Sequence, residues 1–303
     1  MVSRRSFLGI AAAAPFGPAA LSSGPRPAQA GQPAPGGRVP AGSDGITVRR
    51  AGRVEVAFKS PTPRPNGLQA TPEGLWIIDQ GPGSRASLVR YADGSVIRSF
   101  ETDTVRPSGI TFDGQALWIG STFSYENVRV DATTGAVIER RPTPGCTTYA
   151  MAGDPPQRRS PLAPPPVPRP AAAAAAPAPA RLTQAPHLRF QGAHGQEWRN
   201  GRLWTTATCA RAIFEVDPVT WTVHRVLATP GPRPHGLAFQ GRDLWHNDGD
   251  LHAFFRYDLE ANRIVERVNL GDGDPLSHGL TIQGDTFWYC DDVGVICRLP
   301  VRS

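Results

Sequence analysis

The chain has 303 residues, of which 40% are hydrophobic and 19% are charged, enough for one large domain or two small ones. Its 32 glycines and 32 prolines exclude a bundle of long helices and favour a turn-rich β architecture. The net charge of +6 falls by three if the first thirty residues are removed, which argues against a nucleic-acid partner.

The first thirty residues have the order of an export signal. Ser3-Arg4-Arg5-Ser6-Phe7-Leu8 is a twin-arginine motif, an apolar run follows to Leu21, and Ala28-Gln29-Ala30 is a small-x-small cleavage site. The run is too short and too often broken by Pro and Gly to be a permanent membrane anchor. We expect residues 1–30 to be a twin-arginine signal peptide, residues 31–46 a disordered linker, and the product to be periplasmic or extracellular.

A repeat organises the rest of the chain. Five segments begin with an x-Gly pair and reach a Leu-Trp pair, or Phe-Trp in the last segment, whose Trp comes nine residues after the Gly. The five x-Gly pairs are Asn66-Gly67, Ser108-Gly109, His194-Gly195, His235-Gly236 and His278-Gly279. Where the units are consecutive, the Trp residues are 41 to 43 residues apart, which is the length of a four-stranded propeller blade.

Local patterns within a unit agree with four short antiparallel strands. In the unit that starts at His235, apolar segments at 237–239, 244–245, 253–257 and 263–267 are separated by polar turns. The last unit contains only three such segments, and residues 53–58 match the fourth-strand pattern of residues 95–100. We therefore predict an all-β propeller over residues 47–303 whose ring is closed by an N-terminal strand.

The number of blades depends on one long interval. Trp118 and Trp204 are 86 residues apart, or two repeat lengths, without a second Leu-Trp pair between them. Residues 155–180 are mostly Pro and Ala and lack the apolar alternation of strands. Five blades with a Pro/Ala-rich insertion at about 143–189 are the favoured interpretation, and six blades with a degenerate third blade are the alternative.

The repeat frame gathers candidate functional residues on one face. In antiparallel neighbours, the x residue and the residue thirteen positions later come to the same end of a blade. One face is then expected to hold the imidazoles of His194, His235 and His278 and the carboxylates of Asp79, Asp248 and Asp291 around a narrow channel. Asn66 and Ser108 take the x position in the other two units.

The three histidines allow three interpretations. Neutral imidazoles that converge on one axis can bind a divalent metal such as Zn²⁺ or Mg²⁺ with a coordination position left open. They can also act as acids and bases without a metal, or only stabilise the strand entrance. The aspartates either stabilise turns or, for Asp248 and Asp291, accept hydrogen bonds that orient His235 and His278.

Further polar residues lie close to this face in the repeat frame. Arg64, Arg106 and Arg233 precede three of the x-Gly pairs and either bind an anionic ligand or remain solvated. Glu197 is the one carboxylate in the first-strand segments and is a candidate general base. Four cysteines allow three disulfide pairings, and Cys290 and Cys297 flank a predicted hairpin turn.

Two families resemble this chain. The frame x-Gly-(Leu/Ile)…Leu-Trp…Asp…Arg-Tyr-Asp resembles streptogramin (virginiamycin B) lyases and NHL-type repeats, although those lyases have seven blades. The resemblance implies a histidine base, at His235 or His278, that opens an ester by elimination with a divalent metal. The segment from His194 to Trp204, continuing through Ile213 to Asp217, is similar to a blade of the five-bladed glutamine cyclotransferases, with Glu197 in the place of a carboxylate.

The cyclotransferase resemblance departs from its pattern in one place. Those enzymes carry an acidic residue after the first blade's aromatic pair, where this chain has Ile77 and Ile78. The sequence therefore predicts an exported, monomeric propeller that binds a small molecule at a His-lined channel mouth. It leaves open a metal-dependent lyase or hydrolase, a cyclotransferase-like enzyme, and a non-catalytic envelope scaffold.

Overall fold

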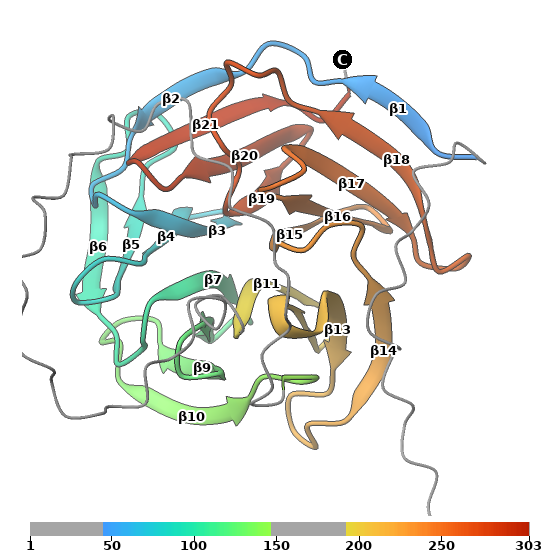
Figure 1. Ribbon diagram of the computed structural model, residues 1–303. Helices are drawn as coiled ribbons and strands as arrows, with labels where there is room; N and C mark the ends of the chain where they lie inside the picture. The colour runs from blue at the N-terminus through green and yellow to red at the C-terminus, as the bar shows by residue number, and fades with distance from the viewer. Residues whose placement is uncertain (1–44, 147–191, 303) are drawn as a thin grey trace, which may run out of the picture. The chain divides into compact units, whose positions relative to one another are not determined.

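A computed structural model describes residues 45–146 and 192–302 (Figure 1). The predicted signal peptide, almost all of the predicted linker, and most of the Pro/Ala insertion lie outside the described residues. The regular secondary structure of the described part is all strand, apart from one turn of 3₁₀ helix, η2 (Thr208–Ala210). No helix among these residues has the length and apolar character needed to cross a membrane.

The strands form five sheets. Blade 1 contains β3 (Pro65–Thr71), β4 (Gly74–Asp79), β5 (Arg85–Val89) and β6 (Val96–Glu101). Blade 2 contains β7 (Pro107–Phe112), β8 (Ala116–Ser121), β9 (Glu126–Asp131) and β10 (Val137–Pro142). Blade 3 contains β11 (Ala193–Arg199), β12 (Arg202–Ala207), β13 (Ala212–Val216) and β14 (Val223–Ala228).

The last two blades use the N-terminal strands. Blade 4 contains β15 (Pro234–Gln240), β16 (Asp243–Asp248), β17 (Ala253–Asp258), β18 (Arg263–Asn269) and an outer β1 (Thr47–Arg50). Blade 5 contains β19 (Leu280–Gln283), β20 (Thr286–Asp291), β21 (Val295–Pro300) and β2 (Glu55–Lys59). The predicted propeller is confirmed, and it has five blades, so the six-bladed alternative is wrong.

The predicted closure of the ring is also confirmed. β2 pairs antiparallel with β21, from Glu55 opposite Arg298 to Lys59 opposite Val295. β1 was not predicted and adds a fifth strand to blade 4, parallel to β18. Arg49 of β1 forms an ion pair with Glu266 of β18 at 2.7 Å, which helps to hold this short strand at the edge of the sheet.

Apolar side chains fill the interfaces between neighbouring blades. The repeat Trp residues are almost fully buried, and four of the five buried clusters in the described residues combine adjacent blades, as where Trp76 and Ile78 of blade 1 pack with Ile110 and Leu117 of blade 2. Strands covered on both faces have few polar positions, which is why β4 reads Gly-Leu-Trp-Ile-Ile-Asp. The Leu-Trp pairs therefore form the core, as the repeat predicts.

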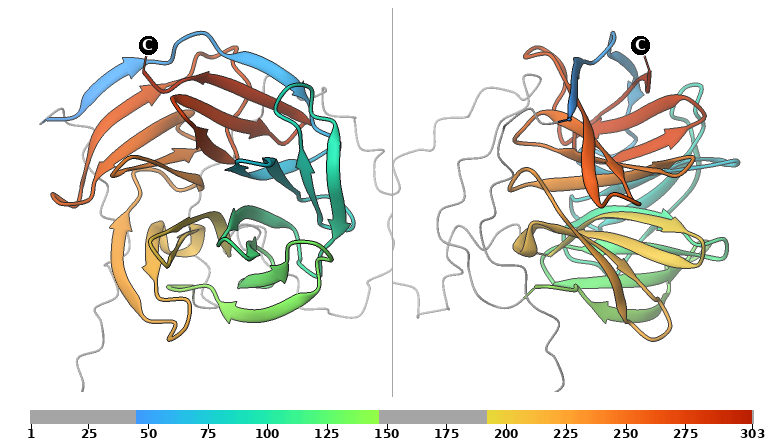
Figure 2. Two further views of the ribbon diagram at one scale, coloured as in Figure 1. Left: turned by 180° about the vertical axis from the view of Figure 1, so that it is seen from behind. Right: turned by 90° about the vertical axis from the view of Figure 1, so that its right-hand side faces the viewer.

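Five glycines let the first strands approach one another at the centre of the ring. Figure 1 shows β3, β7, β11, β15 and β19 gathered there, and Figure 2 shows the same arrangement from behind. A Cβ atom on Gly67 would lie 2.7 Å from the Cα of Gly109, and one on Gly279 would lie 2.8 Å from the Cα of Gly67. Gly109 faces the carbonyl of His194 and Gly195 that of His235 in the same way. The Gly of each x-Gly pair thus packs against the next blade at the centre of the ring.

The four cysteines form one disulfide and leave two free thiols, so none of the three pairings into two disulfides is complete. Cys146, just after blade 2, is bonded to Cys209 in the η2 turn of blade 3. Cys290 and Cys297 lie on the neighbouring strands β20 and β21 and are buried free thiols. The single disulfide therefore joins two blades, and the hairpin of blade 5 is held by packing.

Candidate functional site

The x residues of blades 1 to 4 lie at β-bulges, and His278 of blade 5 lies just before β19. In blade 1 the ladder pairs Pro65 with Asp79 and resumes at Gly67 with Ile78, so that Asn66 has no partner across the strand. Similar shifts occur at Ser108, His194 and His235. A bulge of this kind re-aims a side chain and leaves the local backbone to other partners. The register also brings each x residue to the end of the second strand, as the thirteen-residue spacing predicts.

The three histidines lie side by side. The rings of His194 and His235 have centroids 5.0 Å apart and are perpendicular, whereas those of His235 and His278 are 4.6 Å apart and stacked. Each residue is 1% exposed. The imidazoles of three consecutive blades are therefore neighbours, with His235 between the other two.

Hydrogen bonds fix the protonation of two rings. Nδ1 of His194 lies 3.1 Å from the carbonyl oxygen of Gly192, and Nδ1 of His235 lies 2.9 Å from that of Arg233. A carbonyl can only accept, so both rings carry their proton on Nδ1. Nε2 of each ring then presents a lone pair, and no described residue forms a hydrogen bond with it.

The third ring is placed between an amide and a guanidinium. Nε2 of His278 lies 3.5 Å from an Nη of Arg233, which can only donate, and Nδ1 lies 3.2 Å from the amide of Asn66. A neutral His278 therefore carries its proton on Nδ1 and needs an acceptor there. Turning the Asn66 amide places Oδ1 at that position and gives the Nδ1–H an acceptor, and Nδ2 then takes the buried place where Oδ1 has no partner. All three rings then share one tautomer.

Burial keeps the three imidazoles neutral. It lowers the pKa of His194 to about 3 and that of His278 to about 4, and it holds the pKa of His235 well below the usual value. The positive charge of Arg233 lowers all three further, because a cation disfavours a second cation nearby. At neutral pH the cluster offers hydrogen-bond acceptors and one guanidinium.

The three predicted rim arginines occupy different environments. Arg233 is buried beside Asp250, whose Oδ1 lies 3.3 Å from Nη1 of the guanidinium. Arg64 and Arg106 are exposed, and Arg106 lies over the ring of Phe123 at 5.7 Å. Of these three arginines, only Arg233 forms a hydrogen bond with the histidine cluster in the described part of the chain, so it is the arginine best placed to hold a ligand there.

The predicted aspartates bind backbone amides. Oδ2 of Asp79, Asp248 and Asp291 accepts an N–H from the residue two before x, respectively Arg64, Arg233 and Leu276. Their Oδ1 atoms accept further N–H groups of the following turn. These are the bonds of turn-stabilising residues, and a role in ligand binding stays a prediction. Burial raises the pKa of Asp248 to about 6.

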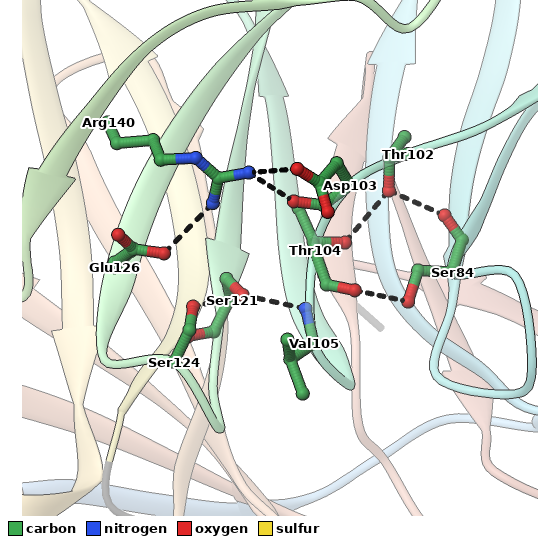
Figure 3. Close-up of polar contacts among 9 residues, drawn as sticks. All are labelled: Ser84, Thr102, Asp103, Thr104, Val105, Ser121, Ser124, Glu126 and Arg140. Carbon is green, nitrogen blue, oxygen red and sulfur yellow. Dashed lines mark hydrogen bonds and ion pairs between the residues drawn. The ribbon is translucent and has the colours of Figure 1, made fainter.

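Blade 2 uses serines at the equivalent places. Oγ of Ser121 accepts the N–H of Val105 at 2.8 Å, as Figure 3 shows. Ser108, at the x position, receives hydrogen bonds from Gln80 at 3.1 Å and from Thr122 at 2.9 Å. The Ser108 hydroxyl thus already accepts two hydrogen bonds from neighbouring side chains. Its contact with a ligand stays a prediction.

A second polar layer lies three residues further along the first strands. Glu197 hydrogen-bonds to Gln69 of blade 1, whose Oε1 accepts from Thr111 of blade 2 at 2.6 Å. β3 and β11 also contact each other directly, although their blades are not adjacent. The sequence singled out Glu197 but not its partners, which the same frame would have found at x plus three. Burial raises the pKa of Glu197 to about 7.

The rings as they lie do not fit one metal ion. His235 and His278 are stacked, so their in-plane lone pairs run alongside each other instead of meeting at a point. Among the residues that the structure describes, no group of three or more His, Cys, Asp or Glu is placed to hold a metal. The shared Nδ1–H tautomer suits metal ligation, but binding would require at least one ring to rotate.

A fourth buried histidine lies outside the site. His246 of β16 packs its ring on Phe255 and Tyr257, with centroids 5.3 and 5.7 Å away. Neither ring nitrogen has a hydrogen-bond partner in the described part of the chain. Burial lowers its pKa to about 3, so it accepts a proton far less readily in the folded protein than in the unfolded one.

This histidine predicts acid sensitivity. Between pH 6.5 and about 3 the unfolded chain binds a proton at residue 246 that the folded chain does not. The free energy of unfolding therefore decreases by about 1.4 kcal/mol for each unit by which the pH falls in this range. His246→Phe should remove this loss, so its stability advantage over the wild type should grow as the pH falls from 6 to 4 in urea denaturation. His246→Leu should give the same pH trend with different packing, and a constant difference in both variants would contradict the prediction.

Comparisons with known proteins agree on the fold. No family model and no curated protein matches the sequence. The glutaminyl cyclase of Myxococcus xanthus aligns with 84% of this chain and 96% of its own, with a TM-score of 0.55 and 8% identity. The virginiamycin B lyase of Staphylococcus aureus, in complex with quinupristin, aligns with 80% of this chain and 67% of its own, with a TM-score of 0.44 and 19% identity. The chain is thus a five-bladed β-propeller similar in fold to the cyclase.

Proposed function

We propose that this protein is an exported enzyme that binds a small polar molecule at the channel mouth and promotes proton transfer in a lyase or hydrolase reaction. The observation that carries the proposal is the cluster of three buried, neutral imidazoles beside the buried Arg233. Buried polar groups of this kind are costly unless they are satisfied by partners or by a ligand.

The groups of the cluster have complementary roles. Arg233 can bind a carboxylate or polarise a carbonyl oxygen. Nε2 of His194 and His235 can accept hydrogen bonds or a proton from the same molecule, and His235 lies nearest to both other rings. A bound anion would offset the charge of Arg233, which is one cause of the low pKa of His235. The imidazole would then become a stronger base when the ligand is present.

Glu197 supports a second candidate function. It is the channel carboxyl whose pKa lies near neutrality, and a group of that pKa is suited to both giving and taking a proton. Cyclisation of an N-terminal glutamine, which the cyclotransferase resemblance implies, would need such a group. In this alternative Glu197 does the proton transfer and the histidines bind the substrate.

Two substrates separate these candidates. Tag-free protein should convert either quinupristin, by opening its ester, or a peptide with N-terminal glutamine, by releasing ammonia. For the lyase, His235→Ala should lower the turnover rate by about 100-fold or more, while Glu197→Gln should have a smaller effect. For cyclisation, Glu197→Gln should lower the turnover rate more than His235→Ala does.

The matched control is His224→Ala, which changes an exposed histidine on β14. It should leave either activity at the wild-type level. If neither substrate binds or reacts, and His194→Ala/His235→Ala/His278→Ala behaves like the wild type toward both, the proposed enzymes are excluded and a non-catalytic scaffold is left.

Binding of a divalent metal by the three histidines stays a prediction, and metal analysis tests it. Protein prepared without a His tag can be analysed for bound Zn²⁺ and Mg²⁺. Close to one equivalent, lost in His235→Ala, would support ligation by His194, His235 and His278. Its absence, together with no effect of added Zn²⁺ or Mg²⁺ on thermal stability, would support the metal-free arrangement derived above.

Export is supported by the chemistry of the cysteines. A disulfide between Cys146 and Cys209 persists in oxidising compartments and rarely in the cytosol. Together with the twin-arginine motif it favours a periplasmic or extracellular location. Replacement of Arg4 and Arg5 by Lys should keep the protein in the cytoplasm, which fractionation of the cells would measure.

A further inference from the structure

The two bulges at His194 and His235 differ from those in blades 1 and 2. In blades 1 and 2 the ladder resumes at the glycine after x, with Gly67 opposite Ile78 and Gly109 opposite Gly120. In blades 3 and 4 it resumes one residue later, at Gln196 and Leu237. Gly195 and Gly236 are therefore left outside the ladder, and their buried N–H groups need other acceptors.

Side chains of the second strands supply those acceptors. The Gly195 N–H donates to Oγ1 of Thr206 at 2.6 Å, and the Gly236 N–H donates to Oδ1 of Asn247 at 2.7 Å. Both side chains are completely buried, and each occupies the position two residues after the repeat Trp.

The same two side chains also reach the next blade. The Thr206 hydroxyl donates to the main-chain carbonyl of His235 at 3.0 Å, and Nδ2 of Asn247 donates to that of His278 at 2.9 Å. Each thus joins the glycine after one histidine to the carbonyl of the next histidine. A chain of hydrogen bonds runs from blade 3 through blade 4 to blade 5.

The side chain at this position hydrogen-bonds to the glycine N–H only in the blades that carry histidine. It is Ile78 in blade 1 and Gly120 in blade 2, and Thr206, Asn247 and Cys290 in blades 3, 4 and 5. Sγ of Cys290 lies 3.2 Å from the Gly279 nitrogen, so it makes the first of the two contacts. Packing alone would accept an aliphatic residue here, as blade 1 demonstrates.

We propose that Thr206 and Asn247 are positioning residues that hold the main chain of His194, His235 and His278 in one mutual arrangement. The inference rests on the proposed function, in which these three imidazoles bind and react with the ligand. Loss of the Thr206 side chain frees the His235 carbonyl and leaves the Gly195 N–H buried without its acceptor. Loss of the Asn247 side chain leaves the Gly236 N–H and the His278 carbonyl held only by their longer mutual hydrogen bond of 3.1 Å. The rings should then adopt more than one orientation, although neither residue touches the ligand.

The test uses full-length protein labelled with ¹⁵N at histidine. In Thr206→Val, the ring signals of His235 should shift or broaden, while Thr206→Ser, which keeps the hydroxyl, should restore the wild-type spectrum. Asn247→Asp keeps the acceptor for Gly236 but loses the donor to His278, so the His278 signals should change. Ile78→Val, at the same position in a blade without histidine, should leave all ring signals in place.

Activity gives the second readout. If quinupristin or the glutaminyl peptide is converted, Thr206→Val should lower kcat about tenfold, with a smaller change in KM. Movement of the ring signals without any conversion would support the positioning role and refute the proposed function. Wild-type ring signals in both folded Thr206→Val and Asn247→Asp, or the same changes in Ile78→Val, would overturn the inference. If Thr206→Val does not fold, Thr206→Ser and Asn247→Asp decide it alone.

Discussion

Replacing Gly195 by Ala is expected to destabilise the propeller by about 3 kcal/mol or more. The added methyl group would overlap the carbonyl oxygen of His235 and come within 2.9 Å of Gly236. Both obstacles are backbone atoms of the next blade, so no side chain can rotate away. For a domain of this size, thermal denaturation should show a melting temperature lower by about 6 °C or more.

The chain offers a matched control for this substitution. Gly273 lies in the exposed loop between β18 and β19, with no atom within 4 Å of an added methyl group and no positive φ. Gly273→Ala should change the stability by less than about 0.5 kcal/mol. Equal melting temperatures for Gly195→Ala and Gly273→Ala would show that the first strands are not packed as closely as described.

The clash also links the fold to the site. Gly195 and Gly236 each follow a channel histidine, and a shift between blades 3 and 4 would separate the rings of His194 and His235. Packing against the next blade therefore requires a glycine at this place in every unit. The x residue can be of different types because the bulge leaves it without a partner across the strand. This is why x differs between blades while the glycine is the same in all five.

The fold could be predicted from the sequence because the repeated residues have definite roles in packing. A Trp nine residues after each glycine fills the interface between blades, and an incomplete last unit calls for a strand from elsewhere in the chain. β1 escaped prediction because Thr47–Arg50 has no apolar alternation of its own. It is held by a parallel ladder and by the ion pair of Arg49 with Glu266, contacts that no local pattern reveals.

The site could be predicted in composition but not in geometry. The repeat frame brings His194, His235 and His278 together, yet spacing alone cannot distinguish rings that converge on a metal from rings that stack. That distinction depends on side-chain torsions and on hydrogen bonds to Gly192 and Arg233. The ion pair of Arg233 with Asp250 and the link from Glu197 to Gln69 were missed for the same reason, since each joins residues from different strands.

Removal of the disulfide is expected to lower stability by about 4 kcal/mol. Cys146 and Cys209 are 63 residues apart in sequence, so the bond restricts a large loop of the unfolded chain. It also lies where packing is least extensive, because the buried apolar cluster around Cys209 contains only Ala207, Ala212, Phe214 and Val216. The Cys146→Ser/Cys209→Ser variant should melt about 10 °C below the wild type.

Reduction supplies the control for that prediction. Dithiothreitol should lower the melting temperature of the wild type to the value of the double variant and should not change the double variant itself. The buried thiols of Cys290 and Cys297 are already reduced, so they cannot account for a response to the reagent. A wild type that melts at the same temperature with and without dithiothreitol, with loss of the bond confirmed by thiol counting, would mean that packing alone joins blades 2 and 3.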